Sequence, residues 1–539
     1  MQRRGVQLLA VSALFALLTA AMTWPQALAL SSAATPHQDV YFNMWRLQWF
    51  AHALATPSAR LFDGNIFYPE PGTLALSDAM FVEGLAAAPL LWAGVKPVLV
   101  HNLLLLGAMA GSGVSMFALA RYLTGSRAAG VIAGMVFSFA PYRFEHVMHM
   151  ELQWAMWSPL AFLALHRTLD TGKRKYGLAT GACLALQMLS SIYYGIFLAS
   201  LIAIGGPLLL VRDRQAPVRR TLVALAGGTA LAIVVSGIYA MPYLRAHDRV
   251  GDRPASEVAA YGARPSSYLA ATPNNWLYGR TFASRGGPER RLFPGAIPVV
   301  LAIVGLLLRV PSRRAIVYLL LLVAAFETSL GFGGYSFTFL YDHLSFYRGL
   351  RASARLGIFV LMFLGVLTAY GYQALAEGRP RLVRVALAAL LALGLMAEYR
   401  VTPVIAPFTN TAPPVYRILA HQPPGVVAEF PVPRADTLPG DEAEYAYMST
   451  FHWFPLVNGY SGNYPPSYLA RLGRLTEFPD DRSLRQLRQD NVAYVVVHGS
   501  SYPEPAFQNL RTRIQLDGAL VELGSFDDGN GRAVLYRLR

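Results

Sequence analysis

Long apolar runs recur through residues 1–400, and short polar connections separate them. A helix of about 20 apolar residues crosses the hydrocarbon core of a bilayer, so these runs predict membrane spans. The pattern predicts a polytopic α-helical membrane protein with about 11 transmembrane helices. The first run could also be a cleavable signal peptide, but the many later runs favour an uncleaved helix. The expected spans are residues 6–30, 98–120, 128–141, 152–166, 176–192, 193–211, 221–244, 294–308, 315–330, 356–376 and 383–398.

A shorter apolar stretch at residues 79–95 does not fit this series. It contains Glu83 and Pro89, and its uncharged part is too short to cross a bilayer. We therefore expect this stretch to lie in the membrane interface. A span here would reverse the side of every later loop.

Basic residues gather in five of the connections, which the positive-inside rule places in the cytoplasm together with the N-terminus. The C-terminus then lies outside, as do the connections 35–97, 141–151, 247–292 and 331–355. The basic residues of the five loops are Arg121 and Arg127; Arg167, Lys173, Arg174 and Lys175; Arg212, Arg214, Arg219 and Arg220; Arg309, Arg313 and Arg314; and Arg379, Arg381 and Arg384.

The first outer loop, residues 31–97, should contain interfacial helices. Residues 35–38 have the form of a capping box with proline at the first helical position, which places Asp39 in the first turn of a helix. Asp39, Asn43 and Arg46 would share one face, beside an aromatic stripe typical of a helix in the membrane interface. Asp39 could merely complement the helix dipole, but its apolar surroundings favour a catalytic role.

The second outer loop, residues 141–151, carries several ionisable side chains between two spans. Such groups are costly at a membrane boundary unless they face a polar cavity. The two histidines, with one of the acids and Asp39, could hold a divalent metal ion. The alternative, which we favour over metal binding, is that these side chains reach the interface and pair with each other. The candidates are Arg143, Glu145, His146, His149 and Glu151.

Three arginines in the fourth outer loop break the positive-inside pattern. Arg348, Arg351 and Arg355 precede a span on the outer side. The planar guanidinium group makes bidentate contacts with phosphate, so a phospholipid or polyprenyl-phosphate head group would suit them. A lipid contact without a catalytic role remains the alternative.

The chain changes character near residue 401, where charges and prolines become frequent. Residues 426–430, 492–497 and 531–538 have the pattern of strands, and 465–475 and 483–490 that of helices. We therefore expect a transmembrane domain at 1–400 and a small C-terminal α/β domain at 401–539 on the outer side.

A segment of the C-terminal domain, residues 451–464, is rich in aromatic and amide side chains, which stack on sugars and hydrogen-bond to them. Its glycines would let the backbone approach a ligand closely. An ordinary turn region that docks the domain on the spans is the alternative. The candidates are Trp453, Asn458, Tyr460 and Asn463.

The composition supports a membrane protein and argues against a nucleic-acid partner. The chain has 539 residues, of which 54% are hydrophobic and 14% charged, and its mean hydropathy is +0.36. The net charge of +15 comes from basic residues in short loops, where the orientation of the chain in the membrane accounts for them. The single cysteine, Cys183, excludes an intramolecular disulfide and a cysteine cluster for zinc.

These features together resemble the GT-C superfamily of membrane glycosyltransferases: most closely its uncharacterised bacterial members, and more distantly the protein O-mannosyltransferases and the aminoarabinose transferases of lipid A. The shared features are an acid near the start of a long first outer loop, interfacial helices, a second outer loop with acids, and a C-terminal outer domain. Many members carry two adjacent acids where this chain has Gln38 and Asp39. A second acid would have to be Asp78, Glu83 or Glu151.

The resemblance implies transfer of a hexosyl or pentosyl group from a polyprenyl-phosphate donor to an acceptor hydroxyl, with inversion. The acceptor could be a glycan, a lipid or a protein. Asp39 would be the general base, and the donor phosphate would bind Arg143, Arg348, Arg351 and Arg355. Trp453, Asn458, Tyr460 and Asn463 would contact the acceptor. The residues expected to position the substrate or a metal ion (Mg, Mn or Zn) are His37, Asn43, Arg46, Asp78, Glu83, Glu145, His146, His149 and Glu151.

Two other functions fit the sequence less well. A flippase or transporter of lipid-linked sugars would place ionisable residues within its spans, whereas these spans are nearly free of charge. A non-catalytic envelope assembly protein would stay functional without the carboxylate of Asp39. The composition is typical of a GC-rich bacterial source, which predicts a bacterial plasma membrane as the location.

Overall fold

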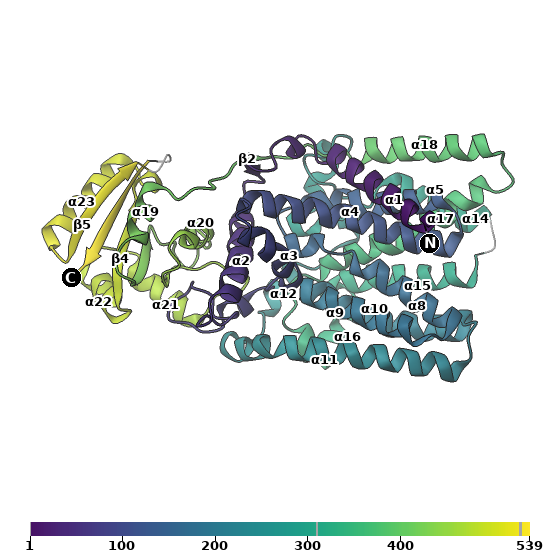
Figure 1. The fold of residues 1–539 in the computed structure, drawn as a ribbon, viewed down its shortest axis with the longest axis horizontal. Helices are drawn as coiled ribbons and strands as arrows, with labels where there is room; N and C mark the ends of the chain where they lie inside the picture. Colours follow the sequence, from purple (N-terminus) through teal and green to yellow (C-terminus); the bar gives the residue numbers. More distant parts are fainter. Residues whose placement is uncertain (1, 309–310, 528–530) are drawn as a thin grey trace. The chain divides into compact units, whose positions relative to one another are not determined.

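The computed structural model describes residues 2–308, 311–527 and 531–539 and divides into two compact units (Figure 1). The helical unit comprises Met1–Leu30, Asn102–Ala240 and Asp252–Ile405. The mixed unit comprises Ser31–His101, Met241–Gly251 and Ala406–Arg539. The first outer loop therefore belongs to the same compact unit as the C-terminal part of the chain.

The helical unit is a bundle around α17. This helix is apolar along its whole length and almost entirely buried, and it packs against α5, α14 and α15 (Figure 1). A helix that is hydrophobic on all sides belongs in the centre of a bundle. The helices assigned to this unit are α1 (Gln2–Met22), α4 (Pro97–Thr124), α5 (Arg127–Phe139), α6 (Pro141–Glu145), α7 (Met150–Gln153), α8 (Trp157–Thr171), α9 (Arg174–Ser190), α10 (Ile192–Asp213), α11 (Val218–Val250), α12 (Ala255–Ala260), α13 (Gly279–Phe282), α14 (Ala296–Leu308), α15 (Arg313–Ser329), α16 (Tyr335–His343), α17 (Gly357–Ala376) and α18 (Arg381–Glu398).

Five helices in the described part of the chain are long and apolar enough to cross a membrane. They are α1, α4, α10, α11 and the segment Ser353–Ala376 that contains α17. The other predicted spans coincide with shorter or less apolar helices, namely α5, α8, α9, α14, α15 and α18. The chain is therefore a multi-pass helical membrane protein, and the count of eleven spans remains a prediction.

Two predicted spans have different boundaries in the structure. The first helix ends at Met22, well before residue 30, because a residue that precedes a proline, here Trp24 before Pro25, disfavours the helical conformation. The span expected at 152–166 begins only at Trp157, because residues 150–153 form the separate short helix α7.

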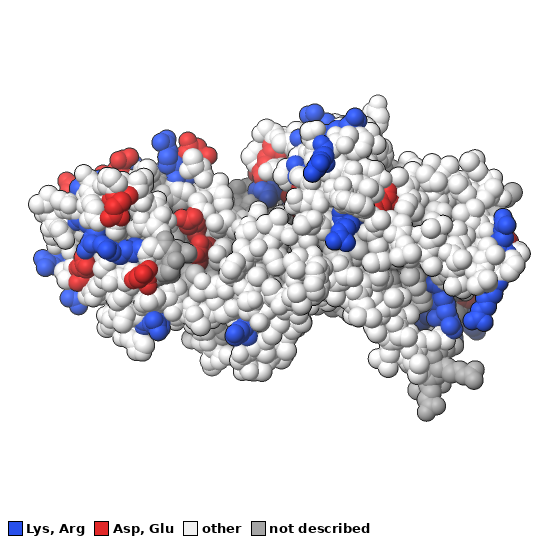
Figure 2. All heavy atoms as spheres, turned by 90° about the horizontal axis from the view of Figure 1, so that it is seen from above, with Lys and Arg blue, Asp and Glu red and all other residues white. Residues whose placement is uncertain are grey.

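The face of the helical unit seen in Figure 2 is mostly uncharged, and the basic groups on this face gather toward the ends of the unit. At the end where α8 and α10 finish and α15 begins, Arg314 lies 2.9 Å from Asp170 and also binds Asp213. The arginines of the predicted cytoplasmic loops are thus partly paired within the protein. Arg309, which belongs to the same predicted set, lies outside the described residues.

The mixed unit joins the first outer loop to the end of the chain. Strands β1 (Ala33–Ala34) and β2 (Ala406–Pro407) pair antiparallel. Helix α2 (Gln38–Ala55) packs against α3 (Phe81–Trp92) and α20 (Glu442–Met448). Backbone hydrogen bonds connect residues 65–68 with 456–458: the N–H of Phe67 donates to Asn458 and that of Leu456 to Asn65.

The end of the chain contains a four-stranded sheet in the order β3-β4-β6-β5, with β3 and β4 parallel and the other pairs antiparallel. Strands β3, β4 and β6 and helices α21 and α22 lie where the pattern predicts them, whereas β5 is an unpredicted edge strand. The remaining elements are α19 (Pro414–Ala420), β3 (Val426–Phe430), α21 (Pro466–Leu475), α22 (Asp481–Gln489), β4 (Val492–His498), α23 (Glu504–Asp517), β5 (Leu520–Asp527) and β6 (Arg532–Leu538).

Candidate active site

Asp39 lies in the first turn of α2, as predicted, but the helix is capped differently. The N-cap is His37, whose Nδ1 accepts the backbone N–H of Asp39 at 3.1 Å. The predicted cap at Thr35 is wrong, because His37 is the last extended residue and its ring nitrogen already satisfies the first free N–H group.

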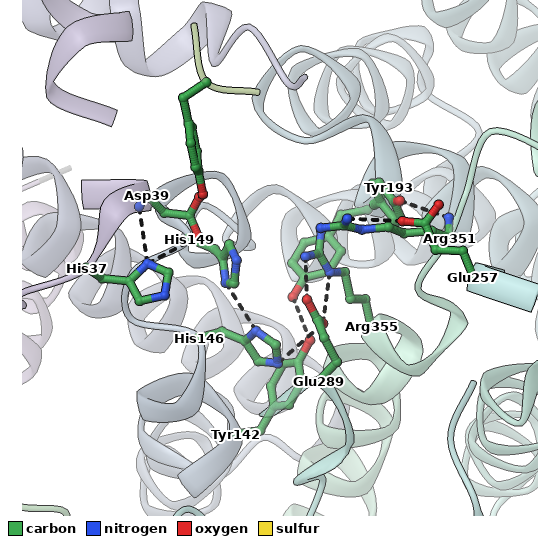
Figure 3. Close-up of polar contacts among 12 residues, drawn as sticks. His37, Asp39, Tyr142, His146, His149, Tyr193, Glu257, Glu289, Arg351 and Arg355 are labelled. Carbon is green, nitrogen blue, oxygen red and sulfur yellow. Dashed lines mark hydrogen bonds and ion pairs between the residues drawn. The ribbon is translucent and has the colours of Figure 1, made fainter. Parts of the chain in front are cut away.

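The carboxylate of Asp39 is oriented by the end of the chain. The hydroxyl of Tyr460 donates to its Oδ1 at 2.6 Å, and burial together with the charge of Asp39 raises the pKa of Tyr460 well above its usual value. Tyr460 is therefore protonated and acts as a permanent donor. The Oδ2 atom lies 3.4 Å from Nδ1 of His37 (Figure 3), and the side chain of Asp39 remains 20% exposed.

The neighbouring polar residues of α2 hold the first outer loop together. The guanidinium group of Arg46 contacts the side-chain oxygen of Asn43 and the backbone carbonyl of Asp78, and it lies 4.5 Å above the ring of Phe42. Glu83, in the first turn of α3, is completely buried. Asp39 therefore combines an oriented carboxylate with partial exposure, whereas Glu83 has no exposure.

The helical unit holds a second polar centre, built around Glu289. Arg355 makes two hydrogen bonds to this carboxylate, at 2.7 and 3.2 Å, and Nε2 of His146 lies 4.0 Å from it (Figure 3). Burial lowers the pKa of His146 to about 3, so this ring is neutral. Burial acts to raise the pKa of Glu289, but the charge and hydrogen bond of Arg355, together with the nearby His146 and His149, hold this pKa well below its usual range.

The second outer loop is fixed by its own side chains. Arg143 is fully buried and donates to the carbonyls of Leu152 and Gln153 at 3.2 and 2.9 Å. Burial lowers the pKa of Arg143 to about 10, which leaves it charged at neutral pH. Glu145 pairs with Arg291 at 2.6 Å. These contacts hold the loop, and the predicted phosphate contact of Arg143 remains a prediction.

The remaining residues of this loop also lie near the Glu289 centre. Nδ1 of His149 is 3.3 Å from Nδ1 of His146, and the charge of Glu151 acts on Arg355. No group of three His, Cys, Asp or Glu side chains suited to a metal ion occurs among the described residues. A metal ion at this loop, the less favoured alternative drawn from the sequence, therefore remains a hypothesis.

The three outer arginines all have protein partners in this structure. Arg348 donates to the carbonyls of Tyr341 and Asp342 at the end of α16, and Arg351 lies 3.2 Å from Glu257. The sequence pattern did not indicate Glu257 and Glu289 as site residues, because neither stands in a periodic pattern. They are the two acids of residues 253–292, and arginines predicted on the outer side need counter-ions, which is the signal that could have found them.

The predicted acceptor residues occupy different environments. Tyr460 contacts Asp39, whereas Asn458 is 1% exposed and hydrogen-bonds to Glu429 and Glu442. Burial raises the pKa of Glu442 well above its usual value, so this acid is neutral. Asn463 donates to the carbonyl of Leu76. Their roles in acceptor binding remain predictions.

No protein-family model and no curated protein matches this chain. Among solved structures, the arabinofuranosyltransferase AftD from Mycobacteria superposes with a TM-score of 0.65 and 15% identity, covering 100% of this chain and 40% of AftD. The oligosaccharyltransferase AglB from Archaeoglobus fulgidus gives a TM-score of 0.43 at 11% identity, over 98% of this chain and 74% of AglB. ArnT from Cupriavidus metallidurans gives 0.38 at 13% identity, over 99% and 98%.

The likeness to AftD shows that the two chains share a fold. This chain spans about 40% of the length of AftD. The resemblance to GT-C membrane glycosyltransferases is therefore confirmed for the fold.

Proposed function

We propose that this chain is a GT-C-type glycosyltransferase that moves a sugar from a polyprenyl-phosphate donor to an acceptor hydroxyl with inversion. The reaction would take place on the outer side of a bacterial plasma membrane, with the N-terminus in the cytoplasm. The fold shared with an arabinofuranosyltransferase supports the general class of reaction.

The placement of Asp39 carries the proposal. Its carboxylate is held by the hydroxyl of Tyr460 and lies beside His37, yet it keeps 20% of its surface exposed. A general base must be oriented and must also be reachable by the group whose proton it takes. Glu83, the other acid in a first helical turn of this loop, is fully buried and fails the second condition.

In the proposed reaction, the acceptor hydroxyl gives its proton to Asp39 as its oxygen attacks the anomeric carbon of the donor. The bond between that carbon and the phosphate oxygen breaks, and the phosphate leaves with the electron pair. Arg351 and Arg355 would stabilise its developing charge. Because Glu257 and Glu289 hold these arginines in the structure, the phosphate would have to replace a carboxylate.

The test compares envelope glycans by mass spectrometry in a strain that lacks the gene. The strain is complemented with wild type, with Asp39→Asn or with Asp436→Asn, all expressed at equal level. Asp436 is 70% exposed and serves as the matched control. We expect a sugar to be absent from the deletion and Asp39→Asn strains and present in the others, since a general base contributes about 10²–10⁴-fold. Full restoration by Asp39→Asn would overturn the proposal.

A further inference from the structure

The mixed unit contains a pocket of about 510 Å³ at the C-terminal end of α2. Its walls come from the last turns of α2, from the end of α3 with the connection that follows it, and from residues 450–453. The pocket lies away from the proposed base, because Asp39 stands at the opposite end of the same helix.

Aromatic rings with fixed orientations form part of this pocket. Trp92 is 57% exposed, yet its indole N–H donates to the carbonyl of Ala51 at 3.1 Å. Trp453 stacks on His52 with the ring centroids 4.1 Å apart and the planes at 14°. An exposed indole that is held in place presents a preformed flat surface to a ligand.

The backbone of Trp453 is strained. Its φ of +59° lies in the left-handed region, which a bulky side chain rarely adopts. Such strain persists only where the surroundings enforce it, and it concentrates at ligand-binding sites. Here the N–H of Trp453 donates to the carbonyl of Ser449 at 2.7 Å and fixes the turn.

Polar groups lie beside these rings. Within the described structure, the side-chain nitrogen of Gln48 is buried and has no hydrogen-bond partner. Burial lowers the pKa of His52, so its ring is a neutral donor and acceptor. Lys96 and Thr450 add an ammonium group and a hydroxyl group to the lining. A ligand with several hydroxyl groups on an apolar ring would satisfy both kinds of wall.

We propose that this pocket binds a sugar ring of the acceptor, and that the acceptor is a glycan chain. The C–H faces of a sugar carry partial positive charge and suit the negative face of an indole, and the sugar hydroxyls would accept from Gln48 and His52. Asp39 and His52 lie on one helix, and thirteen residues at 1.5 Å each separate them by about 20 Å. A single sugar cannot span this distance, whereas a chain can. This inference rests on the proposed function, which supplies the reacting end at Asp39.

The test uses the purified full-length protein in detergent and fluorescently labelled tetrasaccharides of arabinofuranose, mannose and glucose. We expect at least one to bind wild type saturably, and the corresponding disaccharide to bind more weakly. Trp92→Ala and Gln48→Leu should each raise the Kd about tenfold, with partial recovery in Trp92→Phe. Trp276→Ala is the matched control, because Trp276 is 67% exposed and belongs to the helical unit.

Asp39→Asn should bind the tetrasaccharide as wild type does, which separates this inference from the proposed function. The inference is wrong if no tetrasaccharide binds wild type, or if Trp92→Ala binds as tightly as the control. It is also wrong if brominated phospholipids quench the fluorescence of Trp92 and the tetrasaccharide gives no protection, since Trp92 would then be a lipid contact.

Discussion

The two polar centres of this protein hold their carboxylates in different ways. In the helical unit, Glu289 and Arg355 form a buried pair in which each charge neutralises the other, beside the neutral ring of His146. In the mixed unit, Asp39 is held by the neutral hydroxyl of Tyr460 and remains partly exposed.

The two carboxylates differ in access: Glu289 is enclosed by its partners, whereas Asp39 is partly exposed. A buried ion pair has its hydrogen-bonding capacity occupied and costs much to separate. A carboxylate that accepts a hydrogen bond from a neutral donor and stays partly exposed is oriented and can still accept a proton. In the proposed reaction, Asp39 is therefore the base, and a donor phosphate would have to open the Glu289 pair.

The largest expected effect is the loss of one half of the buried pair. Arg355→Met should destabilise the protein by about 3–5 kcal/mol, because Glu289 would remain as an uncompensated buried charge. The measurement is the Tm of the purified protein in detergent. Arg280→Met, at an exposed arginine of the same unit, should leave the Tm unchanged, and adding Glu289→Gln to Arg355→Met should recover part of the loss. Equal Tm values for both single variants would contradict the description of this pair as buried and closed.

The next effect tests the donor to Asp39. Tyr460→Phe removes a hydrogen bond to a charged group, worth about 1.5–3 kcal/mol, but it keeps the ring that packs on Phe42. Glycosyl transfer should fall at least tenfold in kcat, and the Tm should fall by no more than the loss of this hydrogen bond explains. Tyr502→Phe, at a tyrosine distant in sequence from the site, should retain wild-type activity. An unchanged kcat in Tyr460→Phe would show that the reaction does not need the hydrogen bond that orients Asp39.

The two units should also respond oppositely to pH. Glu442 has a raised pKa in the folded protein, so the unfolded chain loses this proton first and stability falls as the pH rises above the ordinary value of a glutamate. Glu289 has a lowered pKa, so its contribution is lost as the pH falls. The Tm of Glu442→Gln relative to wild type should therefore increase from pH 5 to pH 8. Glu477→Gln, at an exposed position, should show a constant difference, and a constant difference in Glu442→Gln would contradict the neutral state of this acid.

The smallest effect on stability is expected at Arg348. Its contacts are two carbonyls at the end of α16, and such an interaction contributes about 0.3–1 kcal/mol. Arg348→Ala should therefore lower the Tm only slightly, whereas a role in phosphate binding would raise the KM for the lipid-linked donor. A lower Tm with an unchanged KM would assign Arg348 to the helix end alone.

The apolar runs predicted the helices well, because a run long enough for a bilayer leaves the backbone no other way to satisfy its hydrogen bonds. Helix ends were harder to predict. Pro25 ends the first helix early, and His37 takes the capping position expected for Thr35. Both outcomes depend on local backbone conformations that the hydropathy pattern does not predict.

Much of the candidate site could not be predicted because its contacts join distant parts of the sequence. Asp39 and Tyr460 were both identified as candidates, but nothing in the sequence pairs them. Glu257 and Glu289 were missed because each lies in a helical segment too short to show a periodic pattern. The edge strand β5 was missed as well, since it contains Gly524 and a register shift where pairing is irregular.

The short pairing of β1 with β2 has a consequence for biosynthesis. It joins residues 33–34 to 406–407, and the partner of Asp39 lies 421 residues further along the chain. The surroundings of the aromatic helix α2 are therefore complete only after almost the whole polypeptide has been synthesised. Until then, α2 would be exposed to chaperones and proteases. A chain that is cut short before Tyr460 lacks the hydroxyl that donates to this carboxylate.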